Sequence, residues 1–156
     1  MRKIAILVLA FVLITTAGCG KKESKPVNNP PAKVVKESIS LEQLKADLKN
    51  MQSLYVELED AFKANKNSNS WGQFSSTWNK KRQAVFDKIK TNYPPSTDPK
   101  DINYQGSNLL GASTSLMILW QEYTNSISGR PANPDHFKAE YKHYITEVEQ
   151  FIKDNQ

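Results

Sequence analysis

Two histidines, His136 and His143, are the side chains in this sequence best suited to bind a metal ion or transfer a proton. They are seven residues apart, so on a helix they share a face but lie about 10 Å apart along its axis, too far for one metal ion to bridge. Glu140 and His143 have the ExxH spacing that di-iron helical bundles use twice, but the sequence contains no second ExxH pair. The spacing therefore predicts no metal site.

Nucleophilic catalysis has no recognisable motif either. Serines are frequent in residues 111–120, "GASTSLMILW", but the GxSxG nucleophile elbow is absent, as are a glycine-rich phosphate loop and the CxxCH haem motif. The acidic residues Glu57, Glu59 and Asp60 fall on the outer face of a predicted helix, where solvent explains them. We predict that the protein is not an enzyme and has no cofactor.

The one cysteine, Cys19, lies in a distinctive setting. Arg2 and Lys3 are followed by an apolar run, residues 4–14, and then by small residues that end in Ala17-Gly18-Cys19. This order is typical of a secretory signal peptide. The apolar segment extended to Gly18 would be roughly 22 Å long as a helix, shorter than the ~30 Å membrane core, so a permanent spanning helix is disfavoured.

The stretch Ala17-Gly18-Cys19 resembles the lipobox of bacterial lipoproteins, although Thr16 stands where that class prefers leucine. The resemblance implies that the Cys19 thiol receives a diacylglyceryl group and that cleavage leaves Cys19 as the first residue. Two or three acyl chains would hold the protein stably on the membrane. We therefore expect a signal peptide over residues 1–18 and a lipid-anchored protein on the extracytoplasmic face of the cell membrane.

Residues 19–39 are expected to form a flexible tether, because they are rich in lysine, asparagine and proline and have no sustained helical or strand period. The basic excess of the chain lies here and in the signal segment. Residues 40–156 contain 14 basic and 14 acidic side chains, so the domain they form is neutral, although the whole chain carries +5. A neutral domain has no electrostatic attraction for nucleic acid, and we predict no such partner.

Residues 40–156 are predicted to form an all-α domain, an antiparallel four-helix bundle. Apolar residues recur every three or four positions in four segments, and strand alternation is absent. The helices are predicted to begin at Ser40, Ser70, Pro99 and Pro134. In the second segment Arg82 falls on the same face as the apolar residues. The inner positions expected from this period are Leu41, Leu44, Leu48, Met51, Tyr55, Leu58, Phe62; Trp71, Phe74, Trp78, Val85, Ile89, Tyr93; Ile102, Leu109, Ala112, Leu116, Trp120, Tyr123, Ile127; Phe137, Tyr141, Tyr144, Val148 and Phe151.

Three apolar residues of the third segment, Leu110, Met117 and Ile118, point sideways or outward from its inner stripe. They are either a surface for an envelope protein partner or side chains of a helix that is enclosed more than the others. The sequence predicts a non-catalytic helical interaction domain held at the membrane through Cys19. The alternative is a bundle that binds a small molecule or lipid between the second and third helices.

Overall fold

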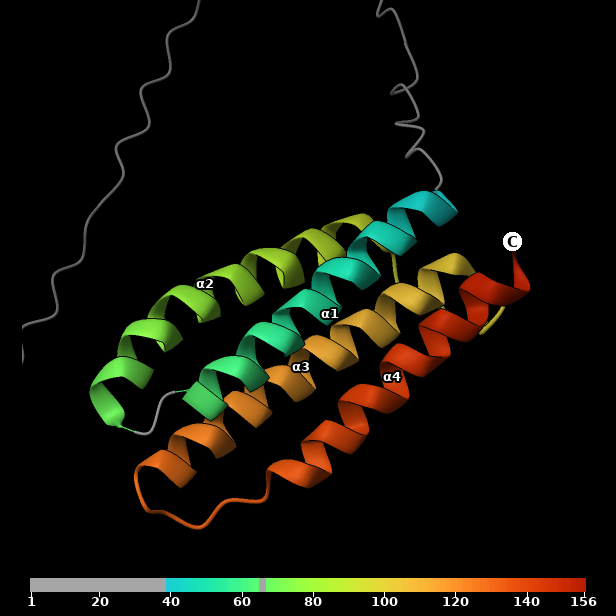
Figure 1. The fold of residues 1–156 in the computed structure, drawn as a ribbon. Helices are drawn as coiled ribbons and strands as arrows, with labels where there is room; N and C mark the ends of the chain where they lie inside the picture. The colour runs from blue at the N-terminus through green and yellow to red at the C-terminus, as the bar shows by residue number, and fades with distance from the viewer. Residues whose placement is uncertain (1–38, 65–66) are drawn as a thin grey trace, which may run out of the picture. The chain divides into compact units, whose positions relative to one another are not determined.

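A computed structural model describes residues 39–64 and 67–156, which form four antiparallel α-helices and confirm the predicted all-α fold (Figure 1). The helices are α1 (Leu41–Ala64), α2 (Ser68–Asn92), α3 (Ile102–Ile127) and α4 (Pro134–Asp154). The α2–α3 connection and the C-terminus lie at the end of the bundle where α1 begins (Figure 1). The predicted signal peptide, Cys19 and nearly all of the predicted tether lie outside the described residues.

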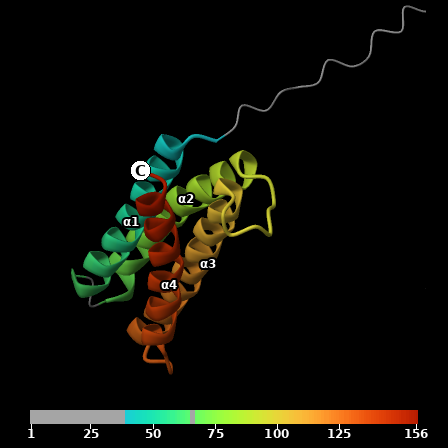
Figure 2. The same ribbon diagram turned by 90° about the vertical axis from the view of Figure 1, so that its right-hand side faces the viewer.

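The helices α1 and α3 form the centre of the bundle. They are neighbours of each other, and each also neighbours both α2 and α4, whereas no Cα atom of α2 lies within 8 Å of one in α4. Figure 1 shows α2 and α4 on opposite sides of the α1–α3 pair, and in Figure 2 α4 passes in front of the bundle with α1 and α3 to either side. Helix α3 consequently has more buried residues than any other described helix.

The hydrophobic core follows the predicted helical period. Leu44, Trp78, Leu116 and Val148, one from each helix, are almost completely buried. Every residue expected on the four inner stripes is either in the core or packed against it. Buried residues that the period did not single out include Asp47, Leu54, Leu119, Ile145 and Ile152.

Two helices begin at positions different from those predicted. Helix α2 begins two residues before Ser70, because the Asn67 side chain caps it by accepting a hydrogen bond from the Ser70 amide, 3.1 Å. Helix α3 begins after Pro99, and the Asp101 carboxylate caps it by accepting from the Asn103 amide, 2.9 Å. Several residues near each start could act as caps, and the one used depends on where packing directs the chain.

Residues Lys36–Gln156 form one compact unit. This unit contains the entire core described above, and its own core is what a domain needs to fold independently. Among the described helices, none has the length and apolar content needed to cross a membrane.

Candidate functional site

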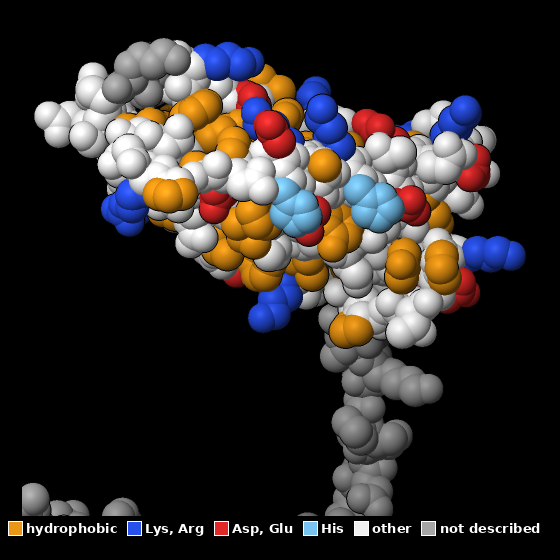
Figure 3. Space-filling model, turned by 90° about the horizontal axis from the view of Figure 1, so that it is seen from below, with side chains coloured by type: hydrophobic (Ala, Val, Ile, Leu, Met, Phe, Trp, Pro, Cys, Tyr) orange, Lys and Arg blue, Asp and Glu red, His pale blue; other side chains and the backbone are white. Residues whose placement is uncertain are grey.

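The histidines examined for metal binding lie on the exposed surface of α4. Figure 3 shows both, in pale blue, on one face of the molecule and separated from each other. His136 Nε2 is 3.4 Å from Glu140 Oε1; the His136 side chain is largely exposed and that of Glu140 is partly exposed. Within the described residues no group of three or more His, Cys, Asp or Glu side chains is placed to hold a metal ion.

The apolar residues predicted to border a partner surface are all half-buried. Leu110 packs against the hydrophobic core. Met117 lines a groove between α2 and α3. Ile118 follows Gly111 by two helical turns and lies on the side of α3 that faces α4, because a Cβ atom at Gly111 would be 2.7 Å from the Tyr144 ring. The three side chains therefore have different surroundings.

A buried carboxylate, that of Asp47 on α1, is the centre of a polar cluster that the sequence did not predict. Its side chain is fully buried. Its Oδ1 is 2.9 Å from Lys88 Nζ, and its Oδ2 accepts hydrogen bonds from Gln43 Nε2, 2.8 Å, and from the Tyr93 hydroxyl, 3.2 Å. Burial and the adjacent Asp47 carboxylate raise the pKa of Tyr93 well above its ordinary value. The cluster joins α1 to the last turn of α2.

A second polar cluster joins α1, α3 and α4. The hydroxyl of buried Tyr123 donates a hydrogen bond to Glu59. Lys138 Nζ is 3.6 Å from Glu59 Oε1 and 5.5 Å from the centre of the Tyr123 ring, within cation–π range. Burial, together with the hydrogen bond to Glu59, raises the pKa of Tyr123 well above its ordinary value. The prediction that Glu59 lies in solvent was wrong: its side chain is only 14% exposed, because α4 covers it.

Arg82 on α2 is the third buried polar residue of note, with only 6% of its surface exposed. Its guanidinium donates hydrogen bonds to neutral acceptors: Asn79 Oδ1 at 3.3 Å, Ser113 Oγ at 3.2 Å and Gln83 Oε1 at 2.9 Å. Among the described residues it forms no ion pair, in contrast to Asp47 and Glu59. Burial lowers the pKa of Arg82, an effect that the negative charge of Asp87 partly opposes.

Arg82 lines an open groove of about 530 Å³ between α2 and α3. Helix α2 also provides Lys80 and several serine and amide side chains, while α3 provides Met117, Trp120 and Gln121. The indole Nε1 of Trp120 donates a hydrogen bond to Ser75 Oγ, 2.9 Å, which holds the ring across the groove. The groove thus combines two cationic side chains, hydrogen-bonding groups and an apolar wall.

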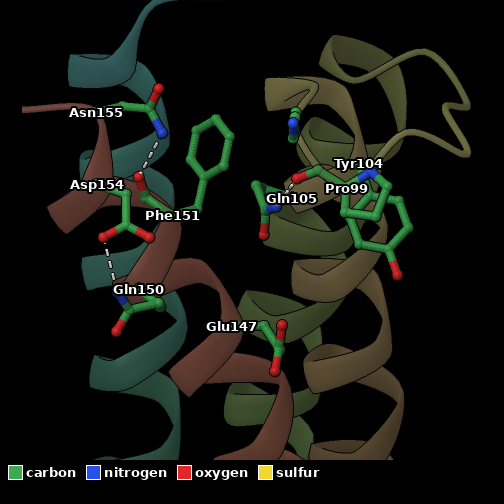
Figure 4. A pocket seen from close by; sticks show the side chains of 9 residues that line it. Pro99, Tyr104, Gln105, Glu147, Gln150, Phe151, Asp154 and Asn155 are labelled. Carbon is green, nitrogen blue, oxygen red and sulfur yellow. Dashed lines mark hydrogen bonds between the residues drawn. The ribbon is translucent and has the colours of Figure 1, made fainter.

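A second hollow, of about 430 Å³, lies between the start of α3 and the end of α4. Figure 4 shows Tyr104 on one side, Phe151 on the other and Glu147 below them. Two of its side-chain amides are already bonded to near neighbours in the chain: Gln105 Nε2 donates to Pro99 O, 3.1 Å, and Gln150 Nε2 donates to Asp154 Oδ1, 2.8 Å. No buried charge without an ionic partner lines this hollow, in contrast to the groove with Arg82.

The helical period located part of the candidate site in advance. It placed Arg82 and Trp120 on inner faces, and both line the groove that the structure forms between α2 and α3. It did not indicate that Asp47 is buried, although Asp47 is adjacent in the chain to inner Leu48 and follows inner Leu44 by three positions. A polar residue at a position of the inner helical period, as Asp47 is, is the sequence signal that would have indicated a buried carboxylate.

Comparison of the chain with protein-family models, with curated proteins and with solved structures gave no match.

Proposed function

We propose that this protein is a lipoprotein anchored through Cys19 on the extracytoplasmic face of the cell membrane, where its helical bundle acts as a non-catalytic binding domain. The observation that carries the proposal is the order of the first nineteen residues: a basic start, an apolar run and Ala17-Gly18-Cys19. The compact unit Lys36–Gln156 supports the proposal of a lipid anchor, because a lipid-anchored protein of this class carries a folded domain after the anchor.

The use of the buried polar side chains supports a non-catalytic role. The carboxylates of Asp47 and Glu59 each contact a lysine and a tyrosine from elsewhere in the bundle. Such contacts stabilise the packing of one helix against another. Catalytic carboxylates generally face a cleft that admits substrate. These two face neighbouring helices, and neither lines the groove with Arg82 or the hollow at the end of the bundle.

Replacing Cys19 by serine in the source cells tests the anchor. The Cys19→Ser protein is expected to leave the membrane fraction or to remain as an unprocessed precursor that takes up no labelled fatty acid. Ser24→Ala, a change in the expected tether, is the matched control and should behave like the wild type. Equal incorporation of labelled fatty acid by Cys19→Ser and wild type would overturn the anchor.

An envelope protein is the first candidate partner, and Leu110, Met117 and Ile118 are its candidate contact residues. Ile118→Lys should abolish cross-linking to that partner while the helical content stays unchanged. Val56→Lys is the matched control, because Val56 is an apolar side chain on α1 that is 55% exposed. Loss of helicity in Ile118→Lys, or equal loss of cross-linking in both variants, would rule out this surface.

A small-molecule ligand is the second candidate, and the groove between α2 and α3 favours it. The groove is within the usual size range of ligand sites, roughly 300–1,000 Å³, at about 530 Å³. Trp120 lines it, so bound ligand is expected to change tryptophan fluorescence. An unchanged spectrum across a panel of envelope lipids and metabolites would count against ligand binding.

A further inference from the structure

We propose that the groove between α2 and α3 binds a small amphipathic oxyanion, a molecule that joins a carboxylate or phosphate group to an apolar part. The inference rests on the second candidate function, ligand binding, and names the ligand class. It is independent of how the protein is held at the membrane.

Arg82 keeps its positive charge although it is buried. A guanidinium remains protonated in proteins, so burial cannot neutralise it as it can neutralise a lysine. Burying a charge without an opposite charge costs folding free energy, which hydrogen bonds to neutral groups offset only in part. Arg82 is 94% buried and is bonded only to Asn79, Gln83 and Ser113. An anion in the groove would supply the missing opposite charge.

The side chains that line the groove carry a net positive charge. Lys80 lines it together with Arg82, and none of the lining residues, all of which are described, is acidic. The nearest carboxylate along the hydrogen-bond chain is that of Asp87, which accepts from Gln83 Nε2, 2.9 Å, while Gln83 Oε1 accepts from Arg82. Asp87 is exposed and is not one of the residues that line the groove. The groove itself is therefore positive in a domain that is neutral overall.

One wall of the groove is apolar. Met117 and Trp120 stand on α3, opposite the cationic side chains of α2. Because Ser75 already accepts the Trp120 indole N–H, the ring presents its hydrocarbon surface to a ligand. A fully polar anion would leave this wall unused, and a neutral apolar molecule would leave Arg82 without a counter-charge. A molecule with an anionic group and an apolar part can bind Arg82 through the first and pack against Met117 and Trp120 through the second.

Isothermal titration of residues 36–156 tests the ligand class. Octanoate and octyl phosphate represent the two oxyanion types on the same apolar chain, and octanol and octylammonium are neutral and cationic controls. We expect octanoate, octyl phosphate or both to bind, and octanol and octylammonium to bind at least about tenfold more weakly, as expected for loss of a charge-assisted hydrogen bond. The stronger of the two oxyanions identifies carboxylate or phosphate as the preferred group.

Two variants locate the site. Arg82→Gln and Lys80→Gln should each weaken binding of the preferred oxyanion, by about tenfold or more for Arg82→Gln, as expected for a buried charged contact. Arg130→Gln, in the exposed α3–α4 connection, is the matched control and should bind like the wild type. Circular dichroism checks folding. If Arg82→Gln fails to fold, Lys80→Gln decides the result, because Lys80 is exposed and makes no hydrogen bond or ion pair in the described structure.

The outcomes separate this inference from the proposals above. Equal binding of octanol and octanoate, unaffected by Arg82→Gln, would overturn the oxyanion class and leave ligand binding standing. No heat with any of the four compounds would overturn the inference. Binding of octanoate that neither variant weakens would show that the site lies elsewhere. The Cys19→Ser experiment tests the anchor independently of all these results.

Discussion

At the scale of single residues, the most informative feature is which buried charged side chains have a partner of opposite charge. Asp47 is fully buried, yet both of its oxygens have partners: Lys88 on one, Gln43 and Tyr93 on the other. Lys88 keeps about half of its side chain in solvent, which lowers the cost of burying the pair. Arg82 has no such ionic partner among the described residues, and this difference separates a stabilising cluster from a candidate binding site.

Replacing Asp47 by asparagine should lower the free energy of unfolding by about 2 to 4 kcal/mol. The amide has the same shape, but its NH₂ group would face the donors of Gln43, Lys88 or Tyr93. Asp87→Asn is the matched control and should change stability by less than about 0.5 kcal/mol, because Asp87 is exposed. Urea unfolding followed by circular dichroism measures both variants. Equal, small effects would show that the Asp47 cluster contributes little to stability.

At the scale of helices, close approach depends on two glycines of α3. A Cβ atom at Gly106 would lie 2.2 Å from the Cβ of Tyr93, and one at Gly111 would lie 2.7 Å from the Tyr144 ring. The first contact is with the stem of a side chain at the end of α2, which cannot turn away. Gly106 therefore allows α3 to pack directly against Tyr93 and helps to place Tyr93 beside Asp47.

Gly106→Ala should destabilise the bundle by about 1 to 3 kcal/mol, because α3 must move away from Tyr93 to make room for the methyl group. Gly72→Ala is the matched control within α2, where nothing lies within 4 Å of the added Cβ. That change should stabilise the protein by about 0.5 to 1 kcal/mol through helix propensity. Thermal unfolding compares the two. Stabilisation by both substitutions would contradict the close packing of α3 on Tyr93.

At the scale of the whole molecule, the bundle is held together by large aromatic residues shared between helices. The Tyr55 and Tyr141 rings stack at 4.5 Å between α1 and α4, and the Phe62 and Tyr123 rings stack at 3.8 Å between α1 and α3. Tyr141 also donates a hydrogen bond to the Met51 carbonyl, 3.2 Å. The hydroxyls of Tyr93, Tyr123 and Tyr141 each donate a hydrogen bond to a residue of α1. Loss of these protons at high pH would break the contacts, so the stability of the domain is expected to be sensitive to high pH.

Stability should be constant near neutral pH and should fall as the pH rises above about 10, the ordinary pKa of tyrosine. Burial raises the pKa of Tyr93, Tyr123 and Tyr141 above that value. The unfolded chain therefore loses these protons first, and unfolding becomes more favourable by about 1.4 kcal/mol per pH unit for each such tyrosine. Urea unfolding across this range measures the slope. Tyr123→Phe should reduce it by about one tyrosine's share, and an unchanged slope would contradict the assignment.

The helical period of the sequence was sufficient to predict the four helices, their antiparallel bundle and most of the apolar residues of the core, although it did not single out Leu54, Leu119, Ile145 or Ile152. It succeeded because the 3.6-residue turn alone decides which side chains share a face, and the hydrophobic effect decides that the apolar face is buried. The same period placed Arg82 and Trp120 inside. The order of residues around Cys19 likewise depends on adjacent positions, so the sequence alone supports the proposed anchor.

The tertiary structure alone decided which polar side chains meet. Asp47 is 41 positions from Lys88 and 46 from Tyr93, and Glu59 is 64 from Tyr123. Such pairs depend on how each helix is rotated and how closely it approaches its neighbours, which Gly106 and the aromatic stacks control. The local sequence pattern of one helix does not indicate which residues of another helix it will contact. The buried charge of Arg82 and the groove above it are therefore properties of the packed bundle, because they exist only once α3 lies against α2.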